Sequence, residues 1–269
     1  EKLQGGPPPV TQLSELFAML KVRVIPTLLW KGLGLVKGVG FDSWRRVGPV
    51  LPAVKVYNAR DVDELILVDI NATLESEFPD HDSVNDFSEE CAVPMTVGGG
   101  ISSLEQVLAL LHSGADKIAI NSAAYADASL IDAAASRFGA QCVVASIDVR
   151  RLDDGYRCFS HAGTQDTGRE VLAWARELAD RGAGEILLTS IERDGSMTGY
   201  DLALVEQVAC AVDIPVIASG GVGNLQHLVD GVIQGGADAV LAASIFHFGE
   251  YSIAEAKQYM HSAGIEMRL

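Results

Sequence analysis

The sequence alternates between short runs of apolar residues and longer segments with apolar residues at helical spacing. The short runs are almost continuously apolar, which is typical of strands buried on both faces of a parallel sheet. We expect strands at residues 23–29, 64–69, 95–98, 117–121, 142–148, 185–190, 215–219 and 239–243. Amphipathic helices are expected between them, among others at 104–112, 168–181, 202–212 and 225–234.

Eight βα units in roughly 250 residues predict an α/β fold, a single (β/α)₈ barrel. A doubly wound open sheet is the alternative, but it usually has fewer units and a single nucleotide fingerprint.

An internal repeat strengthens the barrel prediction. Residues 93–124 (VPMTVGGGISSLEQVLALLHSGADKIAINSAA) align with residues 214–244 (IPVIASGGVGNLQHLVDGVIQGGADAVLAAS). Gly99 then corresponds to Gly220, and Glu64 to Glu185. The chain is therefore predicted to consist of two half-barrels of four βα units each, with equivalent strand ends on opposite sides of one mouth.

The first eighteen residues differ from the rest of the chain. Gly5-Gly6 followed by Pro7-Pro8-Pro9 is typical of a linker. We expect residues 1–18 to be a leader or a cloning remnant, Met19 to be the native start, and residues 19–269 to form the barrel. A native N-terminal arm that contacts a partner is the alternative.

Composition and charge exclude several classes of protein. The 269 residues carry a formal net charge of −16, so we expect no nucleic-acid partner. No run of about 18 apolar residues suggests a membrane span, and no secretory signal is present, so a cytoplasmic protein is expected. The cysteines form no CxxC pair and no metal-binding spacing, so neither metal nor cofactor is predicted; they are Cys91, Cys142, Cys158 and Cys210.

Two glycine-rich turns are candidates for phosphate binding. Gly98-Gly99-Gly100 follows the third expected strand, and Ser219-Gly220-Gly221-Val222-Gly223 follows the seventh. Glycine lets a backbone approach an anion closely, and N–H groups at a helix start point toward it. The fourth and eighth strands end in Asn121-Ser122 and Ala243-Ser244, which could complete the two sites. The pattern predicts a substrate with a phosphate at each end; close packing alone is the alternative.

The expected mouth of the barrel also carries charged residues. Asp148 ends the fifth expected strand, where barrel enzymes place their chemistry, and could act as a general acid or base. Asp69 ends the second strand, and Asp194-Gly195 lies in the loop after the sixth. Lys37 lies in the first loop and could meet an anionic substrate. A structural hydrogen bond or a solvated loop charge is the alternative for each.

The repeat makes one position conspicuous. When residues 24–31 are aligned with 143–150, Asp148 falls opposite Leu29. Leucine cannot transfer protons, so acid and base catalysis by a symmetric pair of carboxylates is not available here.

Four charged residues are expected at the other end of the barrel. Arg23, Glu64, Lys117 and Glu185 lie at strand starts, and charges that enter an apolar barrel need partners. They are predicted to form a charged gate at a channel entrance; surface residues that extend into solvent are the alternative.

The sequence from about residue 19 to residue 269 resembles the cyclase subunit of imidazole glycerol phosphate synthase. The matching stretches are LVKGVGF, DELILVDI, TVGGGI, GADKIAINSAA, GAGEILLTSIERDG, SGGVGN and LAASIFHFGE. The resemblance implies a (β/α)₈ barrel with a class I glutaminase docked at its bottom. Ammonia would pass through the barrel to a two-phosphate substrate, yielding imidazole glycerol phosphate and an aminoimidazole carboxamide ribotide.

The resemblance also implies roles for individual residues. Asp148 matches one of the two catalytic aspartates of that family. Arg23, Glu64, Lys117 and Glu185 match its charged gate. Phosphate or substrate contacts are matched by Gly99, Gly100, Asn121, Ser122, Asp194, Gly195, Gly220, Gly221 and Ser244.

Leu29 stands where the second catalytic aspartate should be, so the sequence looks more like a paralogue found with bacterial surface-polysaccharide genes. In that group the barrel and its glutaminase are associated with an ATP-dependent amidotransferase that installs acetamidino groups on sugars. A histidine-pathway cyclase that tolerates Leu29, and a scaffold that only activates its glutaminase, are the alternatives. A related phosphoribosyl isomerase is disfavoured by the GAGEILLTSIERDG stretch.

Overall fold

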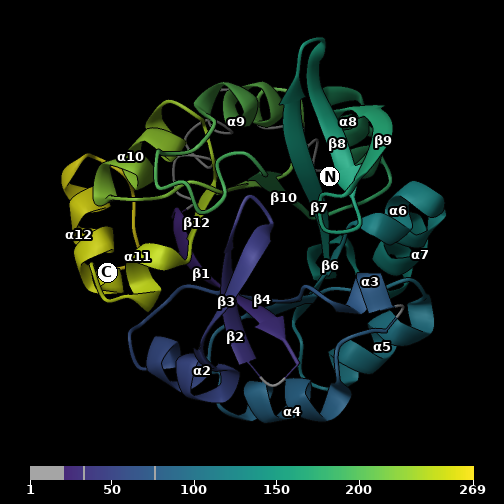
Figure 1. Ribbon diagram of the computed structural model, residues 1–269, viewed down its shortest axis with the longest axis horizontal. Coiled ribbons are helices and arrows are strands. Elements are labelled where there is room, and N and C mark those ends of the chain that lie inside the picture. The colour runs from purple at the N-terminus through teal and green to yellow at the C-terminus, as the bar shows by residue number, and fades with distance from the viewer. Residues whose placement is uncertain (1–20, 33, 76) are drawn as a thin grey trace, which may run out of the picture.

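Eight parallel strands close into a barrel surrounded by helices (Figure 1). The computed structural model describes residues 21–32, 34–75 and 77–269. The barrel order is β1, β4, β5, β6, β7, β10, β11, β12, and pairing of β7 with β10 and of β12 with β1 completes the ring. The predicted (β/α)₈ barrel is therefore confirmed. The proposed leader at residues 1–18 lies outside the described residues.

The strands are β1 (Arg23–Lys31), β2 (Gly34–Val39), β3 (Asp42–Pro49), β4 (Leu65–Asp69), β5 (Met95–Gly98), β6 (Lys117–Ile120), β7 (Val143–Leu152), β8 (Gly155–Ser160), β9 (Gln165–Glu170), β10 (Glu185–Ser190), β11 (Val216–Ser219) and β12 (Ala239–Ala242). The helices are α2 (Val50–Asn58), α3 (Ala72–Glu75), α4 (His81–Glu89), α5 (Leu104–His112), α6 (Ser122–Ala126), α7 (Ser129–Phe138), α8 (Val171–Asp180), α9 (Leu202–Ala209), α10 (Leu225–Ile233), α11 (Ser244–His247) and α12 (Ile253–Ser262), with a 3₁₀ turn, η1, at Ala140–Cys142. Among the described residues, no helix has the length and apolar character needed to cross a bilayer.

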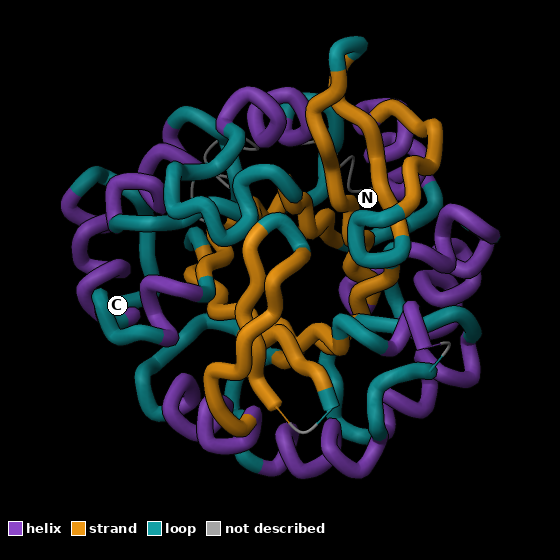
Figure 2. Tube along the Cα trace, in the orientation of Figure 1, coloured by secondary structure: helices purple, strands orange, loops and turns teal. Residues whose placement is uncertain are grey.

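The β2–β3 hairpin lies over the barrel mouth, where Figure 2 shows it reaching across the centre of the ring. Its two-residue turn is Gly40-Phe41, with φ angles of 60° and 64°, as a type I′ hairpin requires. Lys37 was expected in a loop, but it lies on β2. The error arose because this strand pair is antiparallel and mostly polar on β3, unlike the apolar barrel strands.

A second extension follows Asp148. The sequence suggested that the fifth strand ends there, but β7 continues to Leu152 because it pairs antiparallel with β8. The helix expected from residue 168 also begins later, at Val171. Glu170 has an extended backbone and caps α8 by accepting the N–H groups of Leu172 and Ala173, so the preceding residues belong to β9.

The sheet register supports the predicted repeat. Leu29 pairs with Val68, and Asp148 pairs with Thr189, which is the equivalent of Val68 in the second half. Each half also has the same aspartate bond. Asp116 Oδ2 accepts the N–H of Met95 at 2.8 Å, and Asp238 Oδ2 accepts that of Val216 at 2.9 Å. Leu29 and Asp148 therefore occupy equivalent places at the mouth.

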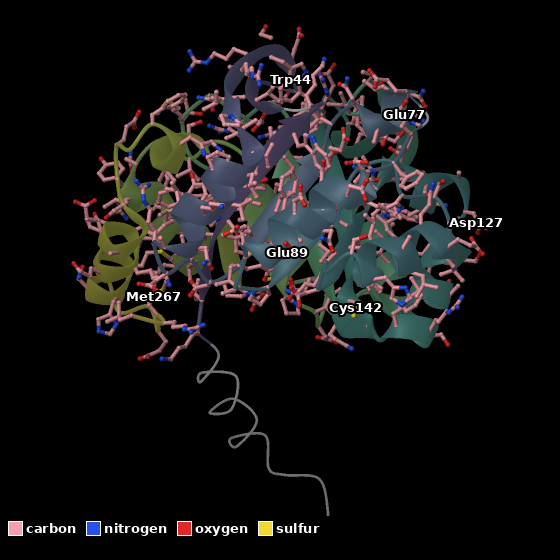
Figure 3. All side chains as sticks on the ribbon, turned by 90° about the horizontal axis from the view of Figure 1, so that it is seen from below. Trp44, Glu77, Glu89, Asp127, Cys142 and Met267 are labelled. Carbon is pink, nitrogen blue, oxygen red and sulfur yellow. The ribbon has the colours of Figure 1, made fainter. Side chains whose placement is uncertain are left out.

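Apolar side chains fill both sides of the barrel wall. The larger cluster lies between strands and helices, and a smaller one fills the inside of the barrel, from residues that include Ile25, Ile66, Val144, Leu187 and Ile217. Figure 3 shows the two ends of the barrel: Trp44 and Glu77 lie at the mouth, and Cys142 and Met267 lie at the base.

One buried ion pair ties the last helix to the barrel. Lys257 Nζ on α12 lies 2.7 Å from Asp63 Oδ1, and both side chains are 6% exposed. Lys257 also donates to the carbonyl oxygen of Asp61, and Asp63 Oδ2 accepts the N–H of Val24. Every charged atom of this pair thus has a partner, which is the condition under which burial of an ion pair is tolerated.

Candidate active site

A pocket of about 460 Å³ opens at the carboxyl ends of the barrel strands. It is the place where barrels of this kind carry their chemistry. The structure brings every residue predicted for the mouth to its wall, namely Lys37, Asp69, Gly99, Gly100, Asn121, Ser122, Asp148, Asp194, Gly195, Ser219, Gly220, Gly221, Ala243 and Ser244.

Asp148 faces this pocket because side chains alternate along β7. Ser146 and Asp148 point inward, whereas Ile147 and Val149 are buried against the helices. Asn121 Nδ2 donates a hydrogen bond to Asp148 Oδ2 at 2.6 Å. Burial and the nearby Asp194 carboxylate raise the pKa of Asp148 to about 7, so it titrates near neutral pH.

Asp194 reaches the same pocket from the loop after β10. Its backbone N–H donates to the carbonyl oxygen of Ser190 at 3.0 Å, so the chain turns back over the mouth. Burial raises the pKa of Asp194 to about 6, although the nearby backbone N–H groups of Phe41 and Gly195 and the Lys37 ammonium act to lower this pKa. Gly40 also donates to the Asp194 carbonyl oxygen at 2.9 Å, which fixes the β2–β3 hairpin to this loop.

Leu29 lines the pocket from β1, among apolar neighbours. Val36, Val68, Leu187 and Leu241 line the same cavity. The mouth is therefore asymmetric: the first half presents an alkyl side chain where the second half presents the Asp148 carboxylate.

The two glycine turns are packed alike and differ in one backbone N–H group, that of Gly100, which has a protein acceptor. The Gly100 N–H donates to Thr73 Oγ1 at 3.1 Å, and a Cβ at Gly99 or Gly100 would collide with a backbone carbonyl oxygen. A Cβ at Gly220 or Gly221 would likewise collide with a backbone carbonyl oxygen, that of Ser190 or Gly199, so close packing explains the glycines of both turns. In the second turn, the N–H groups of Gly220 and Gly221 donate to no protein acceptor within the described ranges, so they are free for an anion.

Lys37 and Arg45 form a pair of cations beside the mouth. They face each other across the β2–β3 hairpin, and both approach the Phe248 ring, at 5.2 Å and 5.1 Å from its centroid. Burial and Arg45 lower the pKa of Lys37. This side of the pocket therefore favours an anionic ligand.

The four charged residues at the base form a closed ring. Arg23 Nη1 lies 2.7 Å from Glu64 and 3.0 Å from Glu185. Lys117 Nζ lies 2.9 Å from Glu64 and 3.1 Å from Glu185. Thr96 Oγ1 also donates to Glu64, which is 1% exposed. Each cation bridges both carboxylates, so the alternative of separate surface charges is wrong.

The comparison with protein-family models agrees with this architecture. Residues 23–252 match the model of the histidine biosynthesis protein family. The chain belongs to this family. Members of the histidine biosynthesis protein family are enzymes, isomerases or cyclases built on such a barrel. The resemblance found in the sequence is thus confirmed at the level of the family.

Asp69 has a structural role in this protein. Its Oδ1 accepts the N–H groups of Asn71 and Ala72 at 3.0 Å and 3.1 Å, which closes the turn before α3. Burial raises the pKa of Asp69. Its contact with a substrate stays a prediction.

A tight turn between β8 and β9 adds residues that the sequence analysis missed. His161, Ala162 and Gly163 have φ angles of 52°, 53° and 75°, and two of them are not glycine. The His161 N–H donates to Ser122 Oγ at 2.9 Å, and among the described residues the Ser122 hydroxyl proton has no acceptor, so it can reach a ligand. Backbone strain of this kind occurs at functional sites. The sequence gives no sign of this turn, because histidine and alanine rarely adopt left-handed backbone and are therefore not expected at such positions.

His247 lines the pocket beneath the β12 end and was also missed. The Thr27 carbonyl oxygen lies 3.1 Å from Nε2 and can only accept, so Nε2 carries the proton. Nδ1 then accepts the Tyr57 hydroxyl at 2.7 Å. Burial lowers the pKa of His247 to about 4. The neutral ring therefore links β1, α2 and α11.

His247→Gln is expected to remove part of the protein's sensitivity to acid. An unfolded histidine takes up a proton below pH 6.5, whereas folded His247 stays neutral until about pH 4, so stability falls as the pH drops through this window. Glutamine keeps the donor to Thr27. Urea unfolding at pH 7 and pH 4.5 should show a loss smaller by about 2–3 kcal/mol in the variant. The exposed His112→Gln should behave like the wild type, and equal losses in all three proteins would contradict this role.

Proposed function

We propose that the chain is the ammonia-using subunit of a glutamine amidotransferase complex. A class I glutaminase docks at the barrel base and releases ammonia, which passes through the barrel to a phosphorylated acceptor at the mouth. The acceptor belongs to the synthesis of acetamidino sugars for surface polysaccharides, together with an ATP-dependent amidotransferase.

The observation that carries this proposal is the ring of ion pairs at the base. Removing four charges from water is costly, and a pocket at the mouth does not need them. The ring lies at strand starts and the pocket at strand ends, and the apolar side chains of the barrel interior lie between them. A ring that opens when a partner binds would admit a small neutral molecule such as ammonia and exclude ions.

The mouth supports an anionic acceptor. The chain carries a net charge of −16, so its overall field repels anions. The N–H groups of Gly220 and Gly221, with Lys37, supply the local attraction that a phosphate requires.

Leu29 favours an acceptor other than the substrate of histidine synthesis. A cyclisation that needs proton transfer on both sides of the mouth loses one participant at this position. The retained Asp148 and its bond to Asn121 favour the second candidate, a true histidine-pathway cyclase that tolerates Leu29. The third candidate is a scaffold that only activates its glutaminase. In that case the Asp148 carboxylate would not affect product formation.

The proposed complex can be tested by following nitrogen from glutamine. The chain would be purified together with its native partner proteins and supplied with glutamine labelled with ¹⁵N in the amide. We expect the label in an acetamidino sugar product. Robust ammonia-dependent turnover of the aminoimidazole ribotide precursor would instead establish the cyclase.

A ring variant tests the passage itself. Glu185→Gln keeps hydrogen-bond acceptors but removes one charge of the ring. We expect the ratio of glutamine-supported to ammonium-supported labelling to fall several-fold. The reason is that ammonia released by the glutaminase would no longer enter the barrel efficiently, whereas ammonium from solution would still reach the mouth. Lys55→Met changes an exposed ion pair with Glu90 and serves as the control. An unchanged ratio in Glu185→Gln would contradict a role of the ring in ammonia passage.

A further inference from the structure

The turn between β8 and β9 brings a histidine into the pocket. β8 and β9 continue the sheet from β7 beside the barrel mouth (Figure 1). His161, the first residue of the turn, lines the same cavity as Ser122. The Thr164 N–H donates to the Ser160 carbonyl oxygen at 3.1 Å, and Gly163 packs against the tip of the β2–β3 hairpin. The position of His161 is therefore fixed by contacts on several sides.

His161 has a backbone conformation that glycine would adopt more easily. Its φ angle is 52°, in the left-handed region where a side chain adds steric cost. A residue that is kept in such a conformation at a pocket wall points to a use for its side chain.

The neutral His161 ring carries its proton on the nitrogen away from Ser160. Ser160 Oγ lies 3.0 Å from His161 Nδ1, and Ser160 is 4% exposed. Within the described ranges the Ser160 hydroxyl has no other acceptor, and a buried hydroxyl group donates wherever it can. Ser160 therefore donates to Nδ1, and Nε2 holds the ring proton. Because His161 lines the cavity, this N–H group is available to a ligand.

The Ser122 hydroxyl is a second donor beside the same turn. Its oxygen accepts the backbone N–H of His161 at 2.9 Å, which leaves its proton for a ligand. Two donors that are held together at one wall of a pocket suit an oxyanion, which accepts hydrogen bonds and donates none.

Arg150 adds positive charge behind the turn. Its register partner Arg157 pairs with Asp154 and Asp166, but no carboxylate pairs with Arg150 among the described residues. The guanidinium lies 5.3 Å from the centroid of the Phe159 ring, and its Nε is buried without a hydrogen-bond partner. Nη2 reaches only the Gly163 carbonyl oxygen, at 3.4 Å. A cation that is partly withdrawn from water without a counter-ion favours an anion nearby.

The carboxyl groups of the cavity do not use these donors. Asp148 Oδ2 accepts from Asn121, and Asp69 Oδ1 accepts two backbone N–H groups. Burial raises the pKa of Asp148 to about 7, so its negative charge at neutral pH is incomplete. The other charged residues that line the cavity are Lys37, Glu77 and Asp194. None of these carboxylates accepts from the His161 ring or the Ser122 hydroxyl in the part of the chain that the structure describes.

We propose that His161 is an anion-binding residue, and that its Nε2–H and the Ser122 hydroxyl together hold a phosphate group of the acceptor. This rests on the proposed phosphorylated acceptor at the mouth. Ser160 is a positioning residue, because it acts only by setting the tautomer of the ring. The two ends of the acceptor are then bound by different chemistry: the backbone N–H groups of Gly220 and Gly221 at one end, and side chains at the β8–β9 turn at the other.

Binding of inorganic phosphate to the full-length protein tests the site without any acceptor. Nitrogen-15 NMR would follow the His161 ring, the Ser122 amide and the Gly221 amide during the titration. We expect phosphate to shift the signals of His161 and Ser122 as well as that of Gly221. Shifts of Gly221 alone, at phosphate concentrations that saturate it, would overturn the proposal.

His161→Asn separates the ring from the turn, because asparagine tolerates left-handed backbone but is too short to reach as far. The dissociation constant of phosphate reported by Ser122 is expected to rise about tenfold or more, as for the loss of a hydrogen bond to a charged group. The constant reported by Gly221 should stay within twofold of the wild type. His112→Gln, at an exposed histidine outside the pocket, should change neither constant. A Ser122 constant within twofold of the wild type in His161→Asn would contradict the role of the ring.

Ser160→Ala tests the positioning role and leaves the imidazole in place. Ring nitrogen shifts at pH 8 should place the proton on Nε2 in the wild type and show a mixture of both tautomers in the variant. The Ser122 constant should rise about two- to fivefold, less than in His161→Asn. A wild-type ring protonated on Nδ1 would overturn the proposed donor.

The outcome for this site is independent of the outcome for the proposed function. A wild-type complex that incorporates no nitrogen from glutamine would overturn the proposed function. The phosphate titration would still decide whether His161 and Ser122 bind an anion.

Discussion

Asp148→Asn is expected to lower ammonia-dependent turnover by about 10²–10⁴-fold while making the folded protein more stable at alkaline pH. Asparagine can still accept the hydrogen bond from Asn121, so the wall of the pocket stays in place. The variant loses the proton that the wild-type carboxyl group carries at neutral pH, and loss of a general acid has an effect of this size.

The stability gain follows from the raised pKa of Asp148. The unfolded carboxyl ionises near pH 3.8 and the folded one near pH 7, so wild-type stability falls as the pH rises between these values. Urea unfolding at pH 8 should show the variant more stable by about 4 kcal/mol, and at pH 4 the two proteins should differ by less than about 1 kcal/mol. A variant that keeps full turnover would show that Asp148 is structural. A variant no more stable at pH 8 would show that its carboxylate is well solvated.

Lys257→Met is expected to cost about 3–5 kcal/mol of unfolding free energy, the largest loss foreseen for a single change outside the pocket. Methionine matches much of the lysine volume, but it leaves the Asp63 carboxylate buried without its cation. The measurement is equilibrium unfolding in urea at pH 7.

The double variant Asp63→Asn/Lys257→Met separates charge from packing. The introduced asparagine can still accept the N–H of Val24 and carries no charge, so the double variant should be more stable than Lys257→Met alone. Lys55→Met, at an ion pair whose side chains are 52% and 44% exposed, should cost less than about 1 kcal/mol. A double variant as unstable as the single one would mean that lysine packing, and not charge, accounts for the loss.

The barrel strands could be predicted because they are apolar on both faces and recur in two halves. The hairpins at the mouth could not, because their strands β3 and β9 are mostly exposed and lack that pattern. Asp148 was consequently placed at a strand end when it lies within a longer one, and Lys37 was placed in a loop.

The residues predicted to line the mouth do line the pocket, because equivalent positions of the repeat lie at the ends of barrel strands. The opposition of Leu29 and Asp148 follows from alignment alone and agrees with the register. The hydrogen bonds of Asp69 to Asn71 and Ala72 and of His247 to Thr27 depend on side-chain rotamers in the folded protein. The spacing of residues along the sequence does not predict these rotamers. The left-handed backbone of His161 was not predicted because histidine rarely adopts this conformation.

The ring at the base has an evolutionary consequence. Its two glutamates obey the repeat, but the positions equivalent to Arg23 and Lys117 are Cys142 and Ala239. Two copies of the second half would place carboxylates face to face without a cation, and two copies of the first would place an excess of cations there. The halves have thus become complementary in charge, so as separate polypeptides they should prefer each other to copies of themselves.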